Sequence, residues 1–118
     1  MENKVVDREI CAPLPRDVCR LATEIIKGHG ARRLRFSQSG LDFDRRAIAA
    51  VCAAMGAIGG DIADKKERLR LQNKVLDSVS RHIPYEYMGD CGCGRQKFYK
   101  YRRELCRRVA EELGMVER

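Results

Sequence analysis

The sequence predicts an all-α protein of about four helices without a sheet. Apolar residues recur at spacings of three and four along every long segment, which is the period of an α-helix. Charged residues make up 35% of the 118-residue chain and aromatic residues only 6%, which favours helices over sheets. We expect a single helical domain over residues 1–118, with an N-terminal helical part over 1–60 and, over 61–118, a long helix followed by a DNA-binding helix.

The first helix is expected from about Pro15 to Gly28. Proline suits the first helical position, because the N–H that it lacks would be unpaired there anyway. The apolar stripe of this helix consists of Val18, Leu21, Ala22, Ile25 and Ile26. Residues 31–40 are basic and polar, so we expect a connector that ends in a turn. Its arginines are candidates for a phosphate contact: Arg32, Arg33 and Arg35.

The second helix is expected from about Asp42 to Ile58, with Asp42 or Asp44 as its N-cap. Its side chains are apolar around much of the girth, which is typical of a buried helix. Many of them are small, which would allow a second helix to approach closely.

The third helix is expected from about Ile62 to His82, with Asp61 or Asp64 as a cap and Pro84 as its stop. The residues expected on one face of this helix are Leu69, Val75, Leu76, Val79 and Ile83, with Gln72 among them.

The fourth helix is expected from about Arg95 to Leu113, followed by Gly114 as its C-terminal stop. At 100° per residue its apolar side chains gather on one side: Phe98, Tyr101, Leu105, Val109 and Leu113. The opposite side carries a row that we call the cationic row: Gln96, Lys100, Arg103 and Arg107.

The cationic row predicts a nucleic-acid contact. A charged helix face is usually only solvated, but such a face normally intersperses acids, and like charges at helical spacing destabilise a helix. An α-helix fits the major groove of DNA, where Gln, Lys, Tyr and Arg reach phosphates and base edges. The predicted DNA-contacting residues are Arg95, Gln96, Lys97, Tyr99, Lys100, Arg102, Arg103, Arg107 and Arg108. RNA is the alternative nucleic-acid partner under this hypothesis, although the sequence shows no strand with aromatic residues on which RNA bases could stack.

Residues 77–115 resemble the C-terminal part of phage late-gene transcription regulators of the RinA/ArpU type. The resemblance rests on a helix that closes with Ile83-Pro84, a turn, the tyrosine- and arginine-rich run of residues 98–103, and a final Ala110-x-x-Leu113-Gly114. It implies a small phage or prophage DNA-binding protein with a helix-turn-helix-like C-terminal end. It covers about the last third of the chain.

The cysteines do not predict catalysis or a cofactor. Cys91 and Cys93 are separated by one residue, whereas zinc sites use pairs with two to four intervening residues. A zinc set would have to add His82 and Cys106, so we expect no metal. A position near a helix N-terminus would lower the pKa of these two thiols. The two histidines lie far apart in the chain, so no nucleophile–base pair can be argued, and we expect no enzyme.

The net charge and the first residues of the chain limit which partners and which location we expect. The net charge of +7 favours polyanions such as double-stranded DNA. The charged opening MENKVVDRE has no secretory character, and no apolar run reaches the length of a membrane span, so we expect a cytoplasmic protein without membrane contact. Host RNA polymerase and a second copy of the chain are the protein partners considered. The alternative function is a non-catalytic interaction or assembly factor of phage origin.

Overall fold

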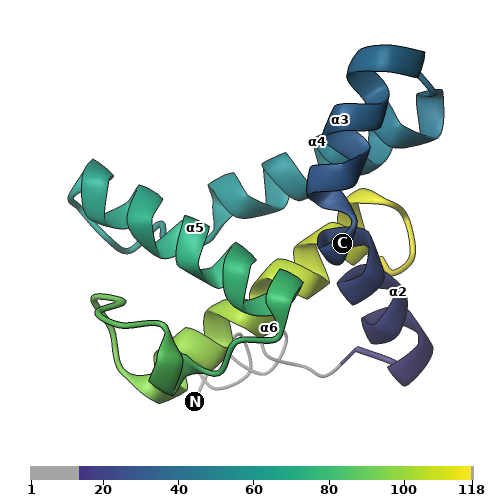
Figure 1. Ribbon diagram of the computed structural model, residues 1–118. Helices are drawn as coiled ribbons and strands as arrows, with labels where there is room; N and C mark the ends of the chain where they lie inside the picture. Colours follow the sequence, from purple (N-terminus) through teal and green to yellow (C-terminus); the bar gives the residue numbers. More distant parts are fainter. Residues whose placement is uncertain (1–13, 118) are drawn as a thin grey trace.

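The computed structural model describes residues 14–117, which form α-helices and one short 3-10 helix without any strand (Figure 1). The helices are α2 (Arg16–Lys27), α3 (His29–Ser39), α4 (Asp42–Ala57), α5 (Lys65–Arg81) and α6 (Arg95–Glu112), with η1 (Tyr85–Tyr87) before α6. The all-α prediction is confirmed for this part of the chain, with one more helix than the four expected. None of these helices has the length and apolar character that a membrane span requires.

The prediction of a connector over residues 31–40 is wrong, because these residues belong to α3. Gly28 does end α2, but α3 starts at the very next residue. Gly40, in the left-handed region with a φ of 66°, ends α3 and turns the chain into α4. Since α3 lacks an apolar stripe of its own, contacts with its neighbours hold it in place. Arg32 donates a 2.5 Å hydrogen bond to the carbonyl oxygen of Ile25, and Arg35 binds Asp44 of α4.

Helix α4 starts near the predicted position but without the predicted cap. Its N-cap residue is Leu41, and no side chain caps it. Asp42 instead pairs with Arg45, 2.6 Å away on the next turn, and Asp44 is buried. The face of α4 that enters the core carries Ala47, Ala50, Val51 and Ala54. Burial is one-sided, because Phe43 and the small residues of the outer face are exposed.

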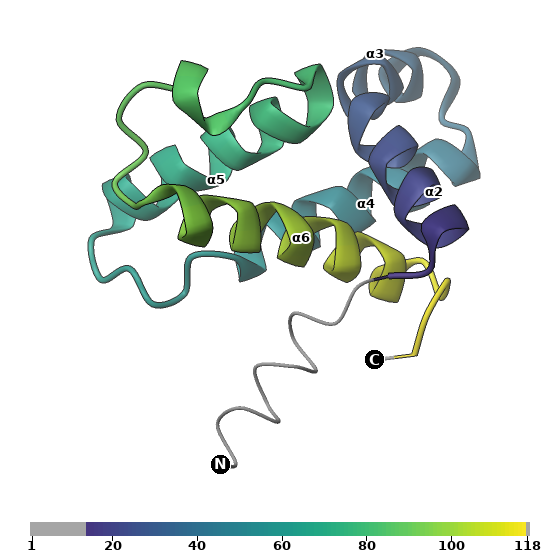
Figure 2. The ribbon, with the colours of Figure 1, turned by 90° about the horizontal axis from the view of Figure 1, so that it is seen from below.

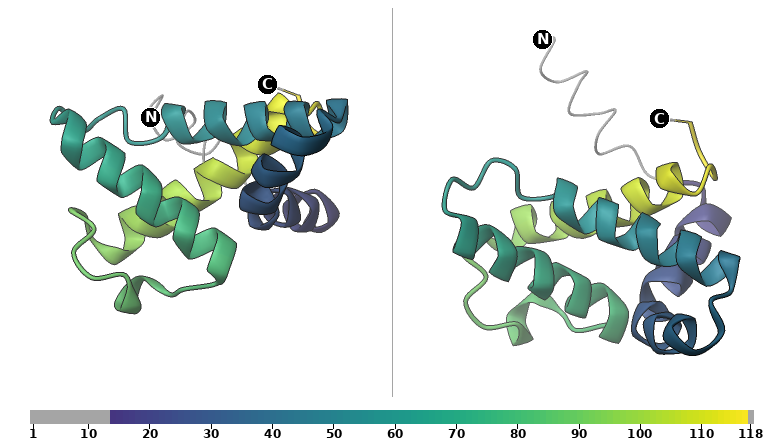
Figure 3. Two further views of the ribbon diagram at one scale, coloured as in Figure 1. Left: turned by 45° about the horizontal axis from the view of Figure 1, so that its top comes forward. Right: turned by 90° about the horizontal axis from the view of Figure 1, so that it is seen from above.

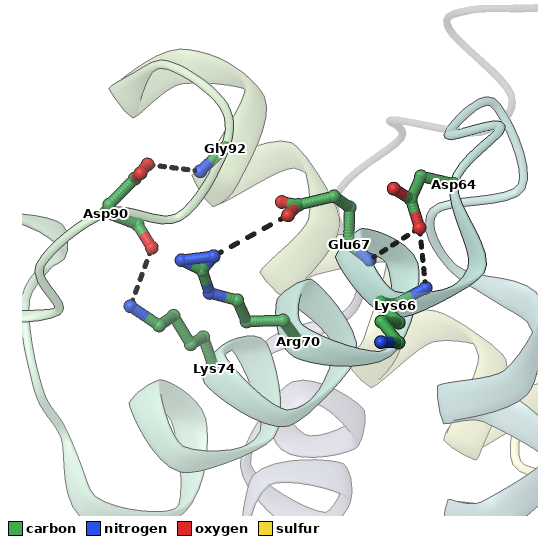
Figure 4. A network of polar contacts seen from close by, with 7 residues as sticks. All are labelled: Asp64, Lys66, Glu67, Arg70, Lys74, Asp90 and Gly92. Atoms are coloured by element: carbon green, nitrogen blue, oxygen red, sulfur yellow. Dashed lines mark hydrogen bonds and ion pairs between the residues drawn. The ribbon is translucent and has the colours of Figure 1, made fainter.

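Helix α5 begins three residues later than predicted, at Lys65, behind the cap Asp64. The Asp64 carboxylate accepts hydrogen bonds from the backbone N–H groups of Lys66 and Glu67, at 2.9 and 3.5 Å (Figure 4). Its buried face carries Leu71, Gln72, Val75, Ser78 and Val79. Leu69, expected on that face, is 55% exposed, so this part of the prediction is wrong. Gln72 is accommodated in the core because its side-chain amide donates to the carbonyl oxygen of Ile58 at 2.9 Å.

Helix α6 is the element on which the others assemble. Figure 2 shows it crossing in front of α4 and α5, with α2 beside its C-terminal half, and all three helices pack against it. In Figure 3, α3 folds back along α4 as the second arm of a helical hairpin. Three residues of its predicted apolar side are fully buried: Phe98, Leu105 and Val109. They contribute to a core that α6 shares with α2, α4 and α5.

Candidate nucleic-acid interface

The segment before α6 is fastened to α5, which fixes where the cationic row begins. The Lys74 ammonium donates to the carbonyl oxygen of Asp90 at 2.7 Å (Figure 4) and to that of Met88 at 2.8 Å. The Asp90 carboxylate accepts a hydrogen bond from the Gly92 N–H at 2.9 Å. The Tyr85 hydroxyl donates to the carbonyl oxygen of Cys93 at 2.9 Å. These contacts hold the chain just before the N-cap Gly94, so the first turn of α6 is presented in one orientation.

The cationic row lies on the side of α6 that faces away from the core. Gln96 and Arg103 are exposed, whereas Lys100 and Arg107 are half-buried. The buried side chains Phe98, Leu105 and Val109 occupy the opposite side, as the helical wheel predicts. Further along α6, few side chains are exposed, and α2 lies beside this C-terminal half of the helix (Figure 2). The accessible part of the row is therefore its N-terminal half.

Within residues 14–117, Gln96, Lys100 and Arg103 make no hydrogen bond or ion pair through their side chains. Their helical neighbour Arg107 differs, because its Nε lies 3.3 Å from Glu111 Oε2, one turn further on. Gln96 and Arg103 also border an open depression of about 470 Å³ together with Arg95 and Tyr99. An amide, an ammonium and a guanidinium thus lie in a row without an internal partner.

Three of the other predicted basic residues of α6 are ion-paired. Arg95 Nε lies 2.7 Å from Glu86, Lys97 Nζ 2.5 Å from Asp61, and Arg108 Nε 3.3 Å from Glu104. The Arg95 and Lys97 hydrogen bonds lower the pKa of their partner carboxyl groups. The Arg95 and Lys97 pairs are exposed and therefore contribute little to stability, so a phosphate group can replace either carboxylate at little cost.

Asp61 has a second partner that the sequence does not reveal. Its carboxylate accepts a 2.8 Å hydrogen bond from the hydroxyl of Tyr101, a residue of the buried side of α6. Burial and this hydrogen bond raise the pKa of Tyr101 to about 12. Asp61 was expected only as a possible helix cap, and it instead ties the α4–α5 loop to α6.

Tyr99 organises the two arginines beside the row. The guanidinium carbons of Arg95 and Arg102 lie 5.0 and 5.1 Å from the centre of its ring, within the range of cation–π contacts. The Tyr99 hydroxyl accepts a hydrogen bond from the backbone N–H of Tyr85 at 3.1 Å. In the part of the chain that the structure describes, Arg102 has no carboxylate partner. Tyr99 is therefore a support for these cations, and its hydroxyl is already engaged.

Two arginines of α2 extend the cationic surface, and they are absent from the predicted site. Arg16 and Arg20 are exposed and share a side of α2 with Cys19 and Thr23, at spacings of three and four. Cys19 and Thr23 border the same pocket as Arg102 and Arg103 of α6. The i,i+4 spacing of Arg16 and Arg20 in the sequence indicates that both lie on one side of a helix. That this side lies next to α6 depends on how α2 packs.

The three arginines considered for a second phosphate contact now belong to α3. Arg35 is bound to the Asp44 carboxylate, and Arg32 lies over the ring of Phe43 at 5.8 Å, besides its bond to Ile25. Only Arg33 projects into solvent without a contact of this kind among the described residues.

The cysteine pair before α6 is not the reactive site that its position suggested. Cys91 is buried, and its thiol lies 3.6 Å from the carbonyl oxygen of Gly89. Burial raises the pKa of both Cys91 and Cys93, against the lowering effect of nearby lysines. The expectation of lowered pKa values is therefore wrong. In residues 14–117, no group of three or more His, Cys, Asp or Glu side chains could hold a metal ion. His82 and Cys106, the other two zinc ligands considered, line a pocket to which neither Cys91 nor Cys93 belongs.

Comparisons with protein-family models, with curated proteins and with solved structures find no match for this chain. The resemblance of residues 77–115 to phage late-gene regulators therefore stays a prediction. The function has to be inferred from the surface of α6 and its surroundings.

Proposed function

We propose that this chain binds double-stranded DNA through the cationic row of α6 and regulates transcription in a phage or prophage, without enzymatic activity. The observation that carries the proposal is the set Gln96, Lys100 and Arg103, which share the open side of α6 and have no partner within the described residues. Cations at helical spacing repel one another and weaken a helix. An external polyanion would neutralise that repulsion.

The chemistry of the row suits the major groove. Recognition helices commonly make base contacts through their N-terminal end, and Gln96 lies on the first turn of α6. A glutamine side chain can form paired hydrogen bonds with adenine, and lysine or arginine with guanine. Lys100 follows on the next turn, and Arg103 and Arg107 lie further along, closer to where the phosphate backbone would run.

Flanking cations would supply the phosphate contacts that set the register of the helix. Arg16 and Arg20 of α2 lie on one flank, and Arg95 and Arg102 lie beside Tyr99. Contacts of this kind position a protein on DNA without reading sequence. The resemblance of residues 77–115 to phage transcription regulators supports sequence-specific recognition and a regulatory role.

The proposal is tested by the affinity of the purified protein for a labelled DNA duplex over a range of salt concentrations. Phosphate contacts make the logarithm of the affinity fall linearly with the logarithm of the salt concentration, with a slope of about −0.9 per contact. We expect such a slope for the duplex and weaker binding to single-stranded RNA of equal length. Binding only to the RNA, or no binding to either at low salt, would contradict the proposal.

A second function, binding of a protein partner, is favoured by a different surface. The α3–α4 hairpin exposes three large apolar side chains, Leu34 of α3, Leu41 of the connecting turn and Phe43 of the first turn of α4, at 71%, 54% and 58%. Large apolar side chains gathered in solvent mark interaction sites. Sedimentation velocity of the protein and of Phe43→Ser tests self-association through this hairpin. A monomer at all concentrations in both forms would argue against a second copy as the partner.

A further inference from the structure

A pocket of about 390 Å³ opens between α2, α5 and α6. Its volume falls in the range of about 300–1,000 Å³ that is usual for small-molecule sites. Much of the wall is apolar or aromatic: Leu14, Cys19, Val79, Tyr99 and Cys106. The hydroxyl of Thr23 already donates to the carbonyl oxygen of Cys19 at 2.8 Å. The wall therefore favours a ligand with a hydrocarbon body, because burying apolar surface is its main source of affinity.

Two guanidinium groups border this pocket without a counter-ion. Arg102 and Arg103 both belong to its lining, and neither has a carboxylate partner in the described part of the chain. Arg102 is half-buried and held over the ring of Tyr99, so little side-chain freedom is left to lose on binding. Planar guanidinium groups bind carboxylates with paired hydrogen bonds. His82, at the end of α5, is the remaining polar group of the lining.

We infer that this pocket binds a small organic acid, with its carboxylate on Arg102 and Arg103 and its hydrocarbon body against Val79 and Tyr99. Inorganic phosphate would match the two cations but would gain nothing from the apolar wall. A neutral hydrocarbon would leave both guanidinium groups without an anion. An amphipathic carboxylate satisfies both features of the pocket together. Such binding goes beyond the proposed function and needs no DNA.

The test uses octanoate as the probe and octanamide as its neutral counterpart of similar shape, with binding to the full chain measured by calorimetry. We expect one molecule of octanoate per chain and at least about tenfold weaker binding of octanamide, because a charge-assisted hydrogen bond is lost. Arg102→Gln and Arg103→Gln should each weaken octanoate binding several-fold and leave octanamide binding unchanged. The matched control Arg46→Gln removes one exposed cation of α4 and should change neither.

A second variant tests the location independently of charge. Cys19 is exposed and lines the pocket, so Cys19→Phe should fill the space without disturbing the core and abolish binding of both probes. Circular dichroism confirms that each variant is folded. Equal affinities for octanoate and octanamide, octanoate binding that survives Cys19→Phe, or no octanoate binding at millimolar concentration would each overturn the inference.

Discussion

Arg35 of α3 donates two hydrogen bonds to Asp44 of α4, from Nε to Oδ2 at 2.7 Å and from Nη2 to Oδ1 at 2.6 Å. Asp44 is only 1% exposed, and the bond to Arg35 lowers the pKa of its carboxyl group. The pair joins the two arms of the α3–α4 hairpin. It explains why a segment without an apolar stripe forms a helix at all.

Replacing Asp44 by Asn should lower the thermal unfolding midpoint measurably, because a buried carboxylate that accepts two charge-assisted hydrogen bonds from Arg35 is lost. The matched control is Asp42→Asn, two residues earlier, where the ion pair with Arg45 is exposed. That change should leave the midpoint almost unmoved. Similar midpoints for the two variants would show that the Arg35–Asp44 pair does not hold α3 in place.

Truncation of Leu105 to Ala should reduce the free energy of unfolding by roughly 2–5 kcal/mol, the usual cost of a cavity at a buried leucine. Leu105 is fully buried in α6. Leu69→Ala is the control, since this leucine of α5 is 55% exposed and an exposed substitution changes stability by within about 0.5 kcal/mol. Chemical denaturation measures both. A cost for Leu105→Ala no larger than that of the control would contradict the packing of α6.

The protein should lose stability as the pH falls from about 7.5 to about 5.5, through the ordinary pKa of histidine. His29 is buried, and its pKa is lowered by burial and by the charges of Arg33 and Arg32. A lowered pKa in the folded state means that the unfolded chain binds more protons below about pH 6.5, which favours unfolding. In His29→Asn this loss should be smaller, as measured by thermal unfolding at both pH values. An undiminished loss in the variant would assign the pH dependence to other groups.

Alkylation by iodoacetamide at neutral pH should reach Cys52 well before Cys91. Cys52 is exposed on the outer face of α4, whereas Cys91 is buried and burial raises its pKa. Both the access and the thiolate fraction of Cys91 are therefore low. Mass spectrometry of timed samples gives the order of modification. Preferential labelling of Cys91 would contradict this expectation and would show that its thiol is reactive, as its position before α6 predicts.

Local signals were sufficient for most helices of this fold. Gly114 follows the end of α6 as predicted, and Asp64, one of the two predicted caps, begins α5, because capping depends on residues that are neighbours in the chain. Helix α3 was missed because what holds it is not local. Its Arg35 reaches Asp44 only after the chain has turned back at Gly40.

The sequence predicts which side of α6 carries the candidate site, but not which of its cations are ion-paired. The wheel of α6 places Gln96, Lys100 and Arg103 opposite the buried stripe, and the structure agrees. Which cations are free could not be read from the helix alone. Asp61, which binds Lys97, comes from the α4–α5 loop, and Glu86, which binds Arg95, comes from η1. The contribution of α2 likewise depends on how that helix packs beside α6.

The most direct measurement for the proposed function is the DNA affinity of a folded triple variant with Gln96→Ala, Lys100→Ala and Arg103→Ala, by fluorescence anisotropy at several salt concentrations. The control, Lys66→Ala with Arg46→Ala, removes the same number of charges from exposed positions of α5 and α4. We expect the triple variant to bind at least about tenfold more weakly, with a salt slope flatter by about two units, and the control to bind much as the parent does. A triple variant that binds as tightly as the parent, or a control that loses as much affinity, would contradict DNA recognition by the cationic row of α6.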